Sequence, residues 1–460
     1  MKPDMERPAI PSARPVSDVS PTVGLLGIAG LFAWVLICRN WPELAATAGL
    51  EGPHERFSGP AAALIALIVT ALPMVLYSVF VERVHLRPST GLDWSEGARR
   101  RFDWSRIALK VGALWATFAI IALFYWLARW YWSGGYGFAI GVLATLIVPI
   151  AIFTIPYIAL VDRAMIEPRD ATWHFGAFLT GLPGWKREQV EKHARTWIIK
   201  GFFTAFMISI LPFGFREVVL ADFGEVASDP VLLGGLLIAG LFLIDVQIGT
   251  VGYILTMRPL DAHIRSGNPF LSGWVAALIC YPPFVWGIIG NGLVLNYETD
   301  TAGWSYWFAG SGVLAWGWMA WLVLLTAVYA WATAVFGIRF SNLTYRGVIT
   351  HGPYRWTRHP AYVSKNLFWW SSVLPFLVTS GSTGDAIRNT FCLLCVNAIY
   401  YWRARTEEAH LLAEDPKYAE YHAWMGQHGL ITAPLARTQA ALASRWRADS
   451  QPSGSPSSVS

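Results

Sequence analysis

Long, almost uncharged apolar stretches recur along this chain and constrain its fold more than any other feature. Most are close to the roughly 20 apolar residues that an α-helix needs to cross a bilayer core. We predict ten membrane spans, at Thr22–Cys38, Pro60–Val81, Ile107–Ala128, Gly137–Val161, Thr196–Leu220, Val231–Met257, Phe270–Leu295, Phe308–Gly337, Ala361–Thr379 and Ala386–Trp402. The predicted fold class is therefore an all-α polytopic membrane protein.

Composition supports this prediction. Of 460 residues, 54% are hydrophobic and 14% are charged, whereas about a quarter of residues are charged in a soluble domain. The 25 Trp and 17 Tyr residues suit a protein with two bilayer interfaces, where their half-polar rings lie at headgroup level. The net charge of +5 does not indicate a nucleic-acid partner, because the basic residues are segregated into one set of loops.

The distribution of Lys and Arg predicts the orientation, because basic residues collect in short cytosolic loops. Lys and Arg are abundant in Glu82–Arg106, Asp162–Arg195, Arg258–Pro269 and Arg339–Pro360. They are absent from Ala221–Pro230, Asn296–Trp307 and Ser380–Asp385. We therefore expect an even number of spans with both termini in the cytosol, in an integral protein of a bacterial inner membrane.

Polar groups within the spans leave two interpretations open. Asp245 and Gln247 lie in the sixth predicted span, where an acidic residue can mark a transport pathway or form an interhelical hydrogen bond. Pro282 and Pro283 are expected to break the seventh span, because proline removes backbone donors. The four cysteines fall inside predicted spans, so neither a disulfide framework nor a metal site is expected.

Two polar clusters stand directly beside apolar spans. The first is Gly352–Tyr362, in which Pro360 is suited to the first helical position and places Tyr362 within one turn of His359. The second follows the tenth span: Arg403 and Glu407 are spaced i,i+4, and Arg405 and Glu408 are spaced i,i+3. We interpret the two clusters as halves of one cytosol-facing site.

These clusters resemble a known family. The pattern Gly352-Pro353-Tyr354-x-x-x-Arg358-His359-Pro360-x-Tyr362, a hydrophobic hairpin, Arg403-x-x-x-Glu407-Glu408 and then Tyr418-x-x-Tyr421 is similar to the C-terminal core of the isoprenylcysteine carboxyl methyltransferase and phospholipid methyltransferase superfamily. The resemblance covers about Phe336 to Trp424. It implies a membrane-embedded methyltransferase that binds S-adenosylmethionine from the cytosol and takes a lipid-like or isoprenoid acceptor from the bilayer.

The resemblance also implies residue roles. The cofactor would contact Tyr354, Arg358, His359, Pro360, Tyr362, Arg403, Glu407 and Glu408. An acceptor carboxylate or thiol (as thiolate) needs no base, whereas an amine or hydroxyl does, and His359 or Tyr362 is then the catalytic candidate. Where the family often has glycine, this chain has Ser364. Lys365 and Asn366, which follow it, are either substrate contacts or, for Lys365, a side chain that reaches the interface.

The segment after Glu408 predicts a further helix, which begins at Asp415 and Pro416. Tyr418, Tyr421 and Trp424 repeat about every three residues, as in a helix that lies on the membrane interface. This helix is expected either to cover the site or to anchor the chain.

The predicted organisation has four parts. Residues 1–21 form a disordered cytosolic tail, 22–300 a membrane region of unassigned role, 301–430 the methyltransferase-like core and 431–460 a second disordered tail. Two other functions stay open. An NADPH-dependent sterol-type reductase also has about ten spans, but typically has Asn before the motif tyrosine, where this chain has Ala361. A transporter would explain Asp245, Gln247 and the broken seventh span, but would leave the cytosolic cluster without a function.

Overall fold

The computed structural model describes residues 13–97, 100–131, 133–290, 294–308, 310–434 and 437–438. Within them the protein is built from helices and one two-stranded antiparallel sheet. The α-helices are α1 (Pro21–Arg39), α2 (Trp41–Thr47), α3 (Pro60–Leu76), α4 (Trp104–Leu127), α5 (Gly135–Ala164), α6 (Ala171–Thr180), α7 (Arg187–Leu220), α8 (Phe223–Val226), α9 (Pro230–Ile254), α10 (Leu271–Leu278), α11 (Phe284–Ile288), α12 (Trp304–Phe308), α13 (Gly312–Ala334), α14 (Pro360–Val373), α15 (Thr383–Glu414) and α16 (Pro416–His428). The strands are β1 (Ser266–Gly267) and β2 (Thr344–Tyr345).

Seven helices of the described chain are long and apolar enough to cross a membrane. They are α1, α3 with its π-helical extension to Val81, α4, α5, α7, α9 and α13. Each coincides with one of the ten predicted spans, so the all-α membrane class is confirmed. The count of ten spans and the cytosolic placement of both termini stay predictions.

The other three predicted spans have a different form. The seventh is broken into α10 and α11, with Pro282 and Pro283 between them, as their sequence predicts. The ninth is the 14-residue helix α14, which ends before Pro375 because the residue before a proline disfavours the helical conformation. The tenth lies within α15, a 32-residue helix that continues far beyond Trp402.

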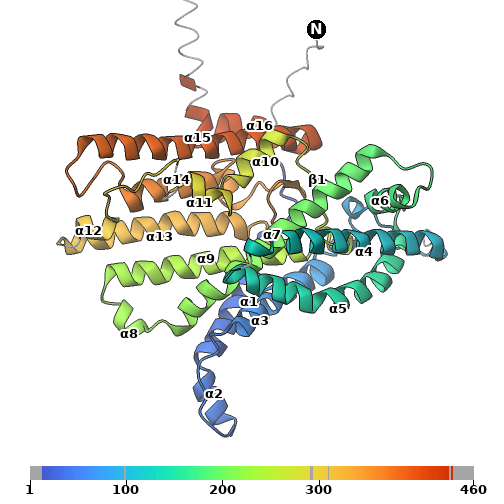
Figure 1. The fold of residues 1–460 in the computed structure, drawn as a ribbon, viewed down its shortest axis with the longest axis horizontal. Helices are drawn as coiled ribbons and strands as arrows, with labels where there is room; N and C mark the ends of the chain where they lie inside the picture. Colours follow the sequence, from blue (N-terminus) through green and yellow to red (C-terminus); the bar gives the residue numbers. More distant parts are fainter. Residues whose placement is uncertain are drawn as a thin grey trace, which may run out of the picture.

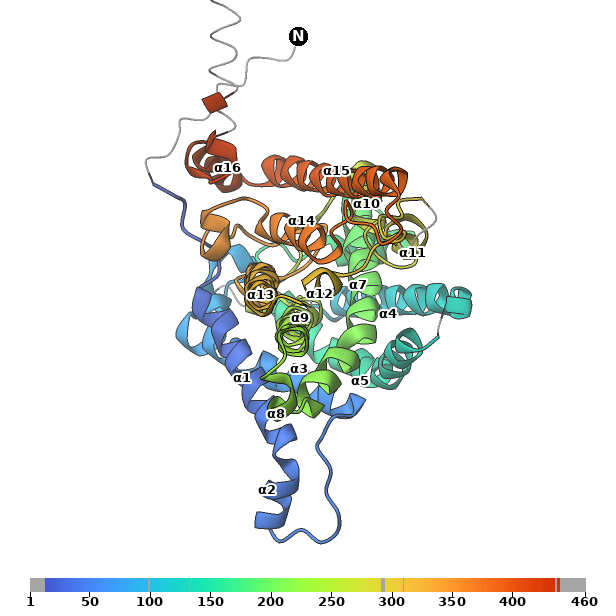
Figure 2. The ribbon, with the colours of Figure 1, turned by 90° about the vertical axis from the view of Figure 1, so that its left-hand side faces the viewer.

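The long helices form a stack. Figures 1 and 2 show α15 and α14 beside one another, then α13, then α9, with α1 and α3 beyond. The helices α4, α5, α6 and α7 lie to one side, and α2 ends an extension at the opposite pole from α16. Helix α13 contacts both α9 and α14. The predicted core of residues 301–430 thus packs directly on the preceding membrane region.

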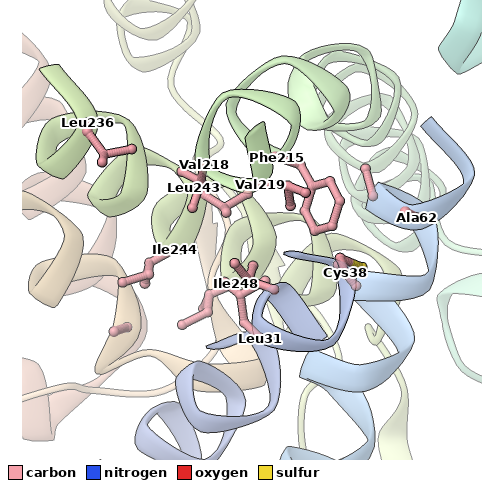
Figure 3. Packing of buried hydrophobic residues seen from close by; sticks show 14 residues of the cluster. Leu31, Cys38, Ala62, Phe215, Val218, Val219, Leu236, Leu243, Ile244 and Ile248 are labelled. Carbon is pink, nitrogen blue, oxygen red and sulfur yellow. The ribbon is translucent and has the colours of Figure 1, made fainter. Parts of the chain in front are cut away.

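Small residues bring α1, α3, α7 and α9 close together around a common apolar core (Figure 3). Phe215 of α7 and Ile248 of α9 are fully buried in this core. At Gly30 of α1 an added Cβ would lie 2.4 Å from the Val69 carbonyl oxygen of α3. Only glycine permits this approach, and close backbone contact is how helices associate without a hydrophobic driving force.

The N-terminal segment differs from the disordered tail that its composition predicts. The Asp18 N–H donates to the Val348 carbonyl, and the Asp18 carboxylate accepts from the Val348 N–H and forms an ion pair with Lys417 of α16 at 2.5 Å. The Ser17 hydroxyl lies 2.7 Å from His351 Nδ1. These tertiary contacts hold the segment against the C-terminal core. Residues 1–12, 435–436 and 439–460, also predicted as disordered, lie outside the described residues.

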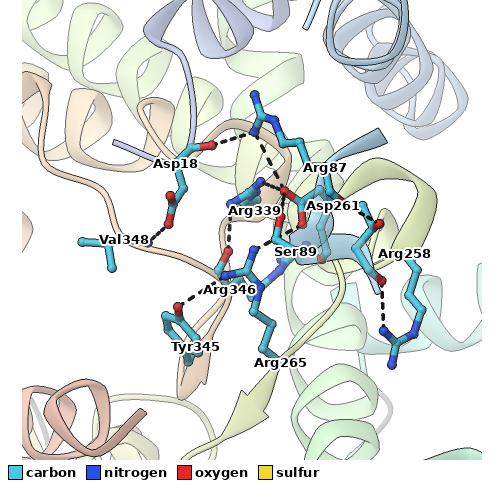
Figure 4. A network of polar contacts seen from close by, with 12 residues as sticks. Asp18, Arg87, Ser89, Arg258, Asp261, Arg265, Arg339, Tyr345, Arg346 and Val348 are labelled. Carbon is cyan, nitrogen blue, oxygen red and sulfur yellow. Dashed lines mark hydrogen bonds and ion pairs between the residues drawn. The ribbon is translucent and has the colours of Figure 1, made fainter. Parts of the chain in front are cut away.

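A buried ion-pair network joins three loops behind the C-terminal helices (Figure 4). Asp261, after α9, pairs with Arg339 at 2.5 Å and with Arg265 at 3.2 Å, and accepts a hydrogen bond from Ser89 at 2.7 Å. The Arg346 guanidinium donates to backbone carbonyls of Ile338, Phe340, Gly252 and Ala262. These contacts fix residues 339–348, which form one wall of the site described next.

Candidate functional site

A 3-10 turn, Gly352–Arg355, and the start of α14 position the first polar cluster. Gly352 has φ +59°, and an added Cβ would lie 2.6 Å from Val335 Cγ1, so glycine is required at this turn. His359 is the N-cap of α14 and Pro360 its first residue, as expected for proline at this position. The His359 and Tyr362 rings stack with centroids 5.5 Å apart.

Glu408 of α15 joins this cluster to the second one. Its side chain is 4% exposed, and Oε1 lies 2.7 Å from Arg358 Nε and 3.0 Å from His359 Nε2. Its Oε2 lies 2.8 Å from Arg405 Nη1, which confirms the predicted i,i+3 pair. The hypothesis that the two motifs meet thus agrees with the geometry.

The charge on Glu408 is strongly favoured. Burial opposes the charged carboxylate, but the hydrogen bond with His359, the nearby His422 ring and the charge of Arg358 outweigh it. The pKa of Glu408 therefore lies well below its ordinary value.

A stability measurement tests this shift. The pKa of Glu408 is lower in the folded state than in the unfolded chain, where it is about 4.3. The charged carboxylate therefore stabilises the fold at any pH above the unfolded pKa. This stabilisation is lost as the pH falls below that pKa toward the folded one. Between about pH 5 and pH 3, the free energy of unfolding is expected to fall more steeply in the wild type than in Glu408→Gln. The difference in slope is expected to reach up to about 1.4 kcal/mol per pH unit. Denaturant titrations across this range measure the difference, and parallel curves would contradict the prediction.

Glu407 anchors a second set of contacts one residue earlier. It accepts a short hydrogen bond from the Tyr362 hydroxyl and one from Arg403 Nε at 3.2 Å, which confirms the predicted i,i+4 pair. Arg403 also donates to Asn342 Oδ1 at 2.8 Å. Its guanidinium carbon lies 5.1 Å and 5.3 Å from the Tyr362 and Tyr281 ring centroids. Arg403 is thereby held between the Tyr362 and Tyr281 rings and the Glu407 carboxylate.

These groups surround a cavity of about 190 Å³. Seven of the predicted site residues line it: Tyr354, Arg358, His359, Tyr362, Lys365, Arg403 and Glu407. Glu408 holds Arg358 and His359 from behind the wall, and Pro360 is buried at the start of α14. The cavity therefore combines cationic, anionic and aromatic groups at the ends of α14 and α15.

Ser364 and Asn366, which follow the first motif on α14, form hydrogen bonds away from the cavity. The Ser364 hydroxyl is buried and donates to the Pro360 carbonyl at 2.8 Å. Asn366 donates to the Tyr362 carbonyl at 2.7 Å and accepts from Asn397 at 2.5 Å. Neither residue lines the cavity. The serine that replaces the family's glycine thus packs within α14, and Asn366 joins α14 to α15.

Sequence reasoning missed several lining residues. Tyr281, Tyr329 and Tyr400 contribute rings from the α10–α11 connection, α13 and α15. They resembled interfacial or core aromatics, and no local pattern distinguished them. Tyr418 and Tyr421, predicted on an interfacial helix, are buried and line the cavity, and Tyr421 donates to the Tyr354 carbonyl at 2.6 Å. This arrangement favours the covering role of α16 over membrane anchoring alone.

The side chains of Asp245 and Gln247 on α9 form hydrogen bonds with neighbouring helices. Asp245 accepts from Thr333 through a short hydrogen bond and from Tyr329 at 3.3 Å, both on α13. Gln247 donates to the Ala63 carbonyl of α3 at 3.4 Å. These contacts favour the interhelical interpretation of Asp245 and Gln247. Across the residues that the structure describes, no group of three or more His, Cys, Asp or Glu side chains is arranged to hold a metal ion.

The fold and the cavity together define a helical membrane protein with a charged, aromatic pocket in its C-terminal part. Residues 312–413 match the family model of the isoprenylcysteine carboxyl methyltransferase (ICMT) family. The matched segment contains both motifs, from Tyr354 to Glu408. The predicted resemblance of the C-terminal core to membrane methyltransferases is therefore confirmed. Searches of curated proteins and of solved structures gave no match.

Proposed function

We propose that this protein is an S-adenosylmethionine-dependent methyltransferase of the membrane that acts on a lipid-like acceptor. One observation carries the proposal. Within the segment that matches the methyltransferase family, the two motifs converge from α14 and α15 on one cavity. The same cavity would have to hold the methyl donor and the reacting atom of the acceptor.

The lining groups fit the donor chemically. Arg403 and Arg358 suit the carboxylate at the amino-acid end of the cofactor, and Glu407 suits its ammonium group or ribose hydroxyls. The rings of Tyr281, Tyr362 and Tyr400 offer faces on which a sulfonium cation is stabilised. Glu408 would act indirectly, by orienting Arg358 and His359 through its ion pairs.

Bound S-adenosylmethionine supplies an electrophilic methyl group, which is transferred in one in-line displacement. The protein then contributes alignment and exclusion of water. For an amine or hydroxyl acceptor, Tyr362 is the better placed base, because its hydroxyl already donates to Glu407. As the Tyr362 oxygen takes the proton of the acceptor, its own hydroxyl proton would pass to the Glu407 carboxylate. His359 Nε2 faces Glu408, so His359 is better suited to positioning.

Two other functions have less support. This chain has Ala361 at the position where the reductase family typically has asparagine. The family model that matches the chain is that of a methyltransferase family. The transporter interpretation rested on Asp245, Gln247 and the broken seventh span, and the first two side chains form hydrogen bonds with neighbouring helices. We further propose that the cavity faces the cytosol of a bacterial cell and receives its acceptor from the bilayer.

Calorimetric titration of the purified protein in detergent tests the proposed function. S-adenosylmethionine and S-adenosylhomocysteine are expected to bind, and NADPH is not, because the lining suits a carboxylate and a sulfonium rather than a set of phosphates. An unrelated helical membrane protein in the same detergent is the control for ligand partition into micelles. Binding of NADPH without either sulfur ligand would contradict the proposal and support the reductase.

A further inference from the structure

Lys365 differs from the other cations of the cavity. It lies on α14, one turn beyond Tyr362, and lines the cavity. Its Nζ is 5.3 to 5.7 Å from the ring centroids of Tyr329, Trp369 and Tyr400. No oxygen of the described chain forms a hydrogen bond or ion pair with it. A cation within an apolar helix bundle is costly without such a partner, and usually serves a function.

The arginines that line the cavity already have oxygen partners. Arg358 pairs with Glu408, Arg403 with Glu407 and Arg339 with Asp261, and Arg346 donates to backbone carbonyls. Lys365 is thus the one lysine or arginine of the described lining whose charge is met by rings alone. Ring faces stabilise an ammonium group but leave its donors unused.

Asp245 is the carboxylate of the bundle that could have neutralised Lys365. It is instead held behind the cavity wall by Thr333 and Tyr329, and it is not among the lining residues. Tyr329 lies between the two charges, since its hydroxyl donates to Asp245 and its ring faces the Lys365 ammonium. Asp245 is therefore engaged by other groups, and Lys365 lines the cavity without a carboxylate partner in the described chain.

We infer that Lys365 anchors an acidic group, a phosphate or a carboxylate, on the lipid-like acceptor. The inference rests on the proposed function, because the same cavity must then hold donor and acceptor together. The acidic group on Lys365 lies one helical turn beyond Tyr362, and the Tyr329 and Tyr400 rings, which also line the cavity, contact the apolar part of the acceptor. This contact selects acidic lipids over neutral ones.

Titration with three amphiphiles of one tail length tests the subsite. Decyl phosphate, decanoate and decanol are added to the full chain in maltoside micelles, with and without S-adenosylhomocysteine. We expect the wild type to bind at least one anion about tenfold tighter than decanol, as a charge-assisted hydrogen bond implies. Lys365→Met abolishes this preference and Lys365→Arg keeps it. The tighter of the two anions identifies the acidic group as phosphate or carboxylate.

Lys200→Met is the matched control, because Lys200 also lies over a ring, at 4.8 Å from Trp197, but does not line the cavity. It is expected to keep the wild-type preference. Equal affinity of the wild type for all three amphiphiles would overturn the inference, as would a preference that survives in Lys365→Met. Weakened S-adenosylhomocysteine binding in Lys365→Met would also overturn it, by assigning the lysine to the cofactor. If no variant binds S-adenosylhomocysteine, the methyltransferase proposal fails, while a Lys365-dependent preference still establishes the acidic-lipid site.

Discussion

Replacement of Asp261 by asparagine is expected to lower the free energy of unfolding by about 3–5 kcal/mol. The carboxylate is 1% exposed and faces Arg339, whose side chain is 3% exposed, at 2.5 Å. Removal of one charge from a buried pair leaves the other in a medium of low dielectric constant without compensation. Asparagine keeps the shape of the side chain, so the loss reports the charge. Unfolding in mixed micelles, followed by circular dichroism, measures this difference.

Asp385→Asn is the matched control, because Asp385 forms a partly exposed i,i+3 pair with Arg388 at 3.0 Å, with side chains 24% and 46% exposed. Its expected cost is below about 1 kcal/mol, since exposed pairs contribute little. Similar costs for Asp261→Asn and Asp385→Asn would show that the network of Figure 4 does not hold the loops as described.

Glu408→Gln and His359→Ala are expected to weaken binding of S-adenosylmethionine, the first by about tenfold to a hundredfold. Glu408 fixes both Arg358 and His359, so its replacement frees two lining side chains at once. His359→Ala removes one lining ring and leaves the Arg358 pair, so its effect is expected to be smaller. Calorimetry at neutral pH measures both dissociation constants.

Glu420→Gln provides the control, because Glu420 is exposed on α16. It is expected to retain wild-type affinity. Size-exclusion profiles and helicity at neutral pH show whether each variant is folded. Wild-type affinity in both Glu408→Gln and His359→Ala would detach these residues from the cofactor site.

Hydropathy and prolines predicted much of the architecture. Seven predicted spans became spanning-length helices, and Pro282 and Pro283 broke the segment in which they lie. Hydropathy failed to predict the end of α14, because Leu374 and the residues after Pro375 are apolar but not helical. Apolar composition measures the cost of exposure to water, whereas helix length also depends on backbone geometry.

The sequence by itself determined the membrane class, the two motifs and the local pairs along α15. These features depend on composition and on spacing within one element, such as Arg403 with Glu407. The tertiary structure alone decided which distant groups meet. It brought Tyr281 and Tyr329 into the cavity, bound the N-terminal segment through Asp18, and left Lys365 without an oxygen partner among the described residues. Such contacts depend on how helices pack side by side, and no local spacing in the chain encodes that arrangement.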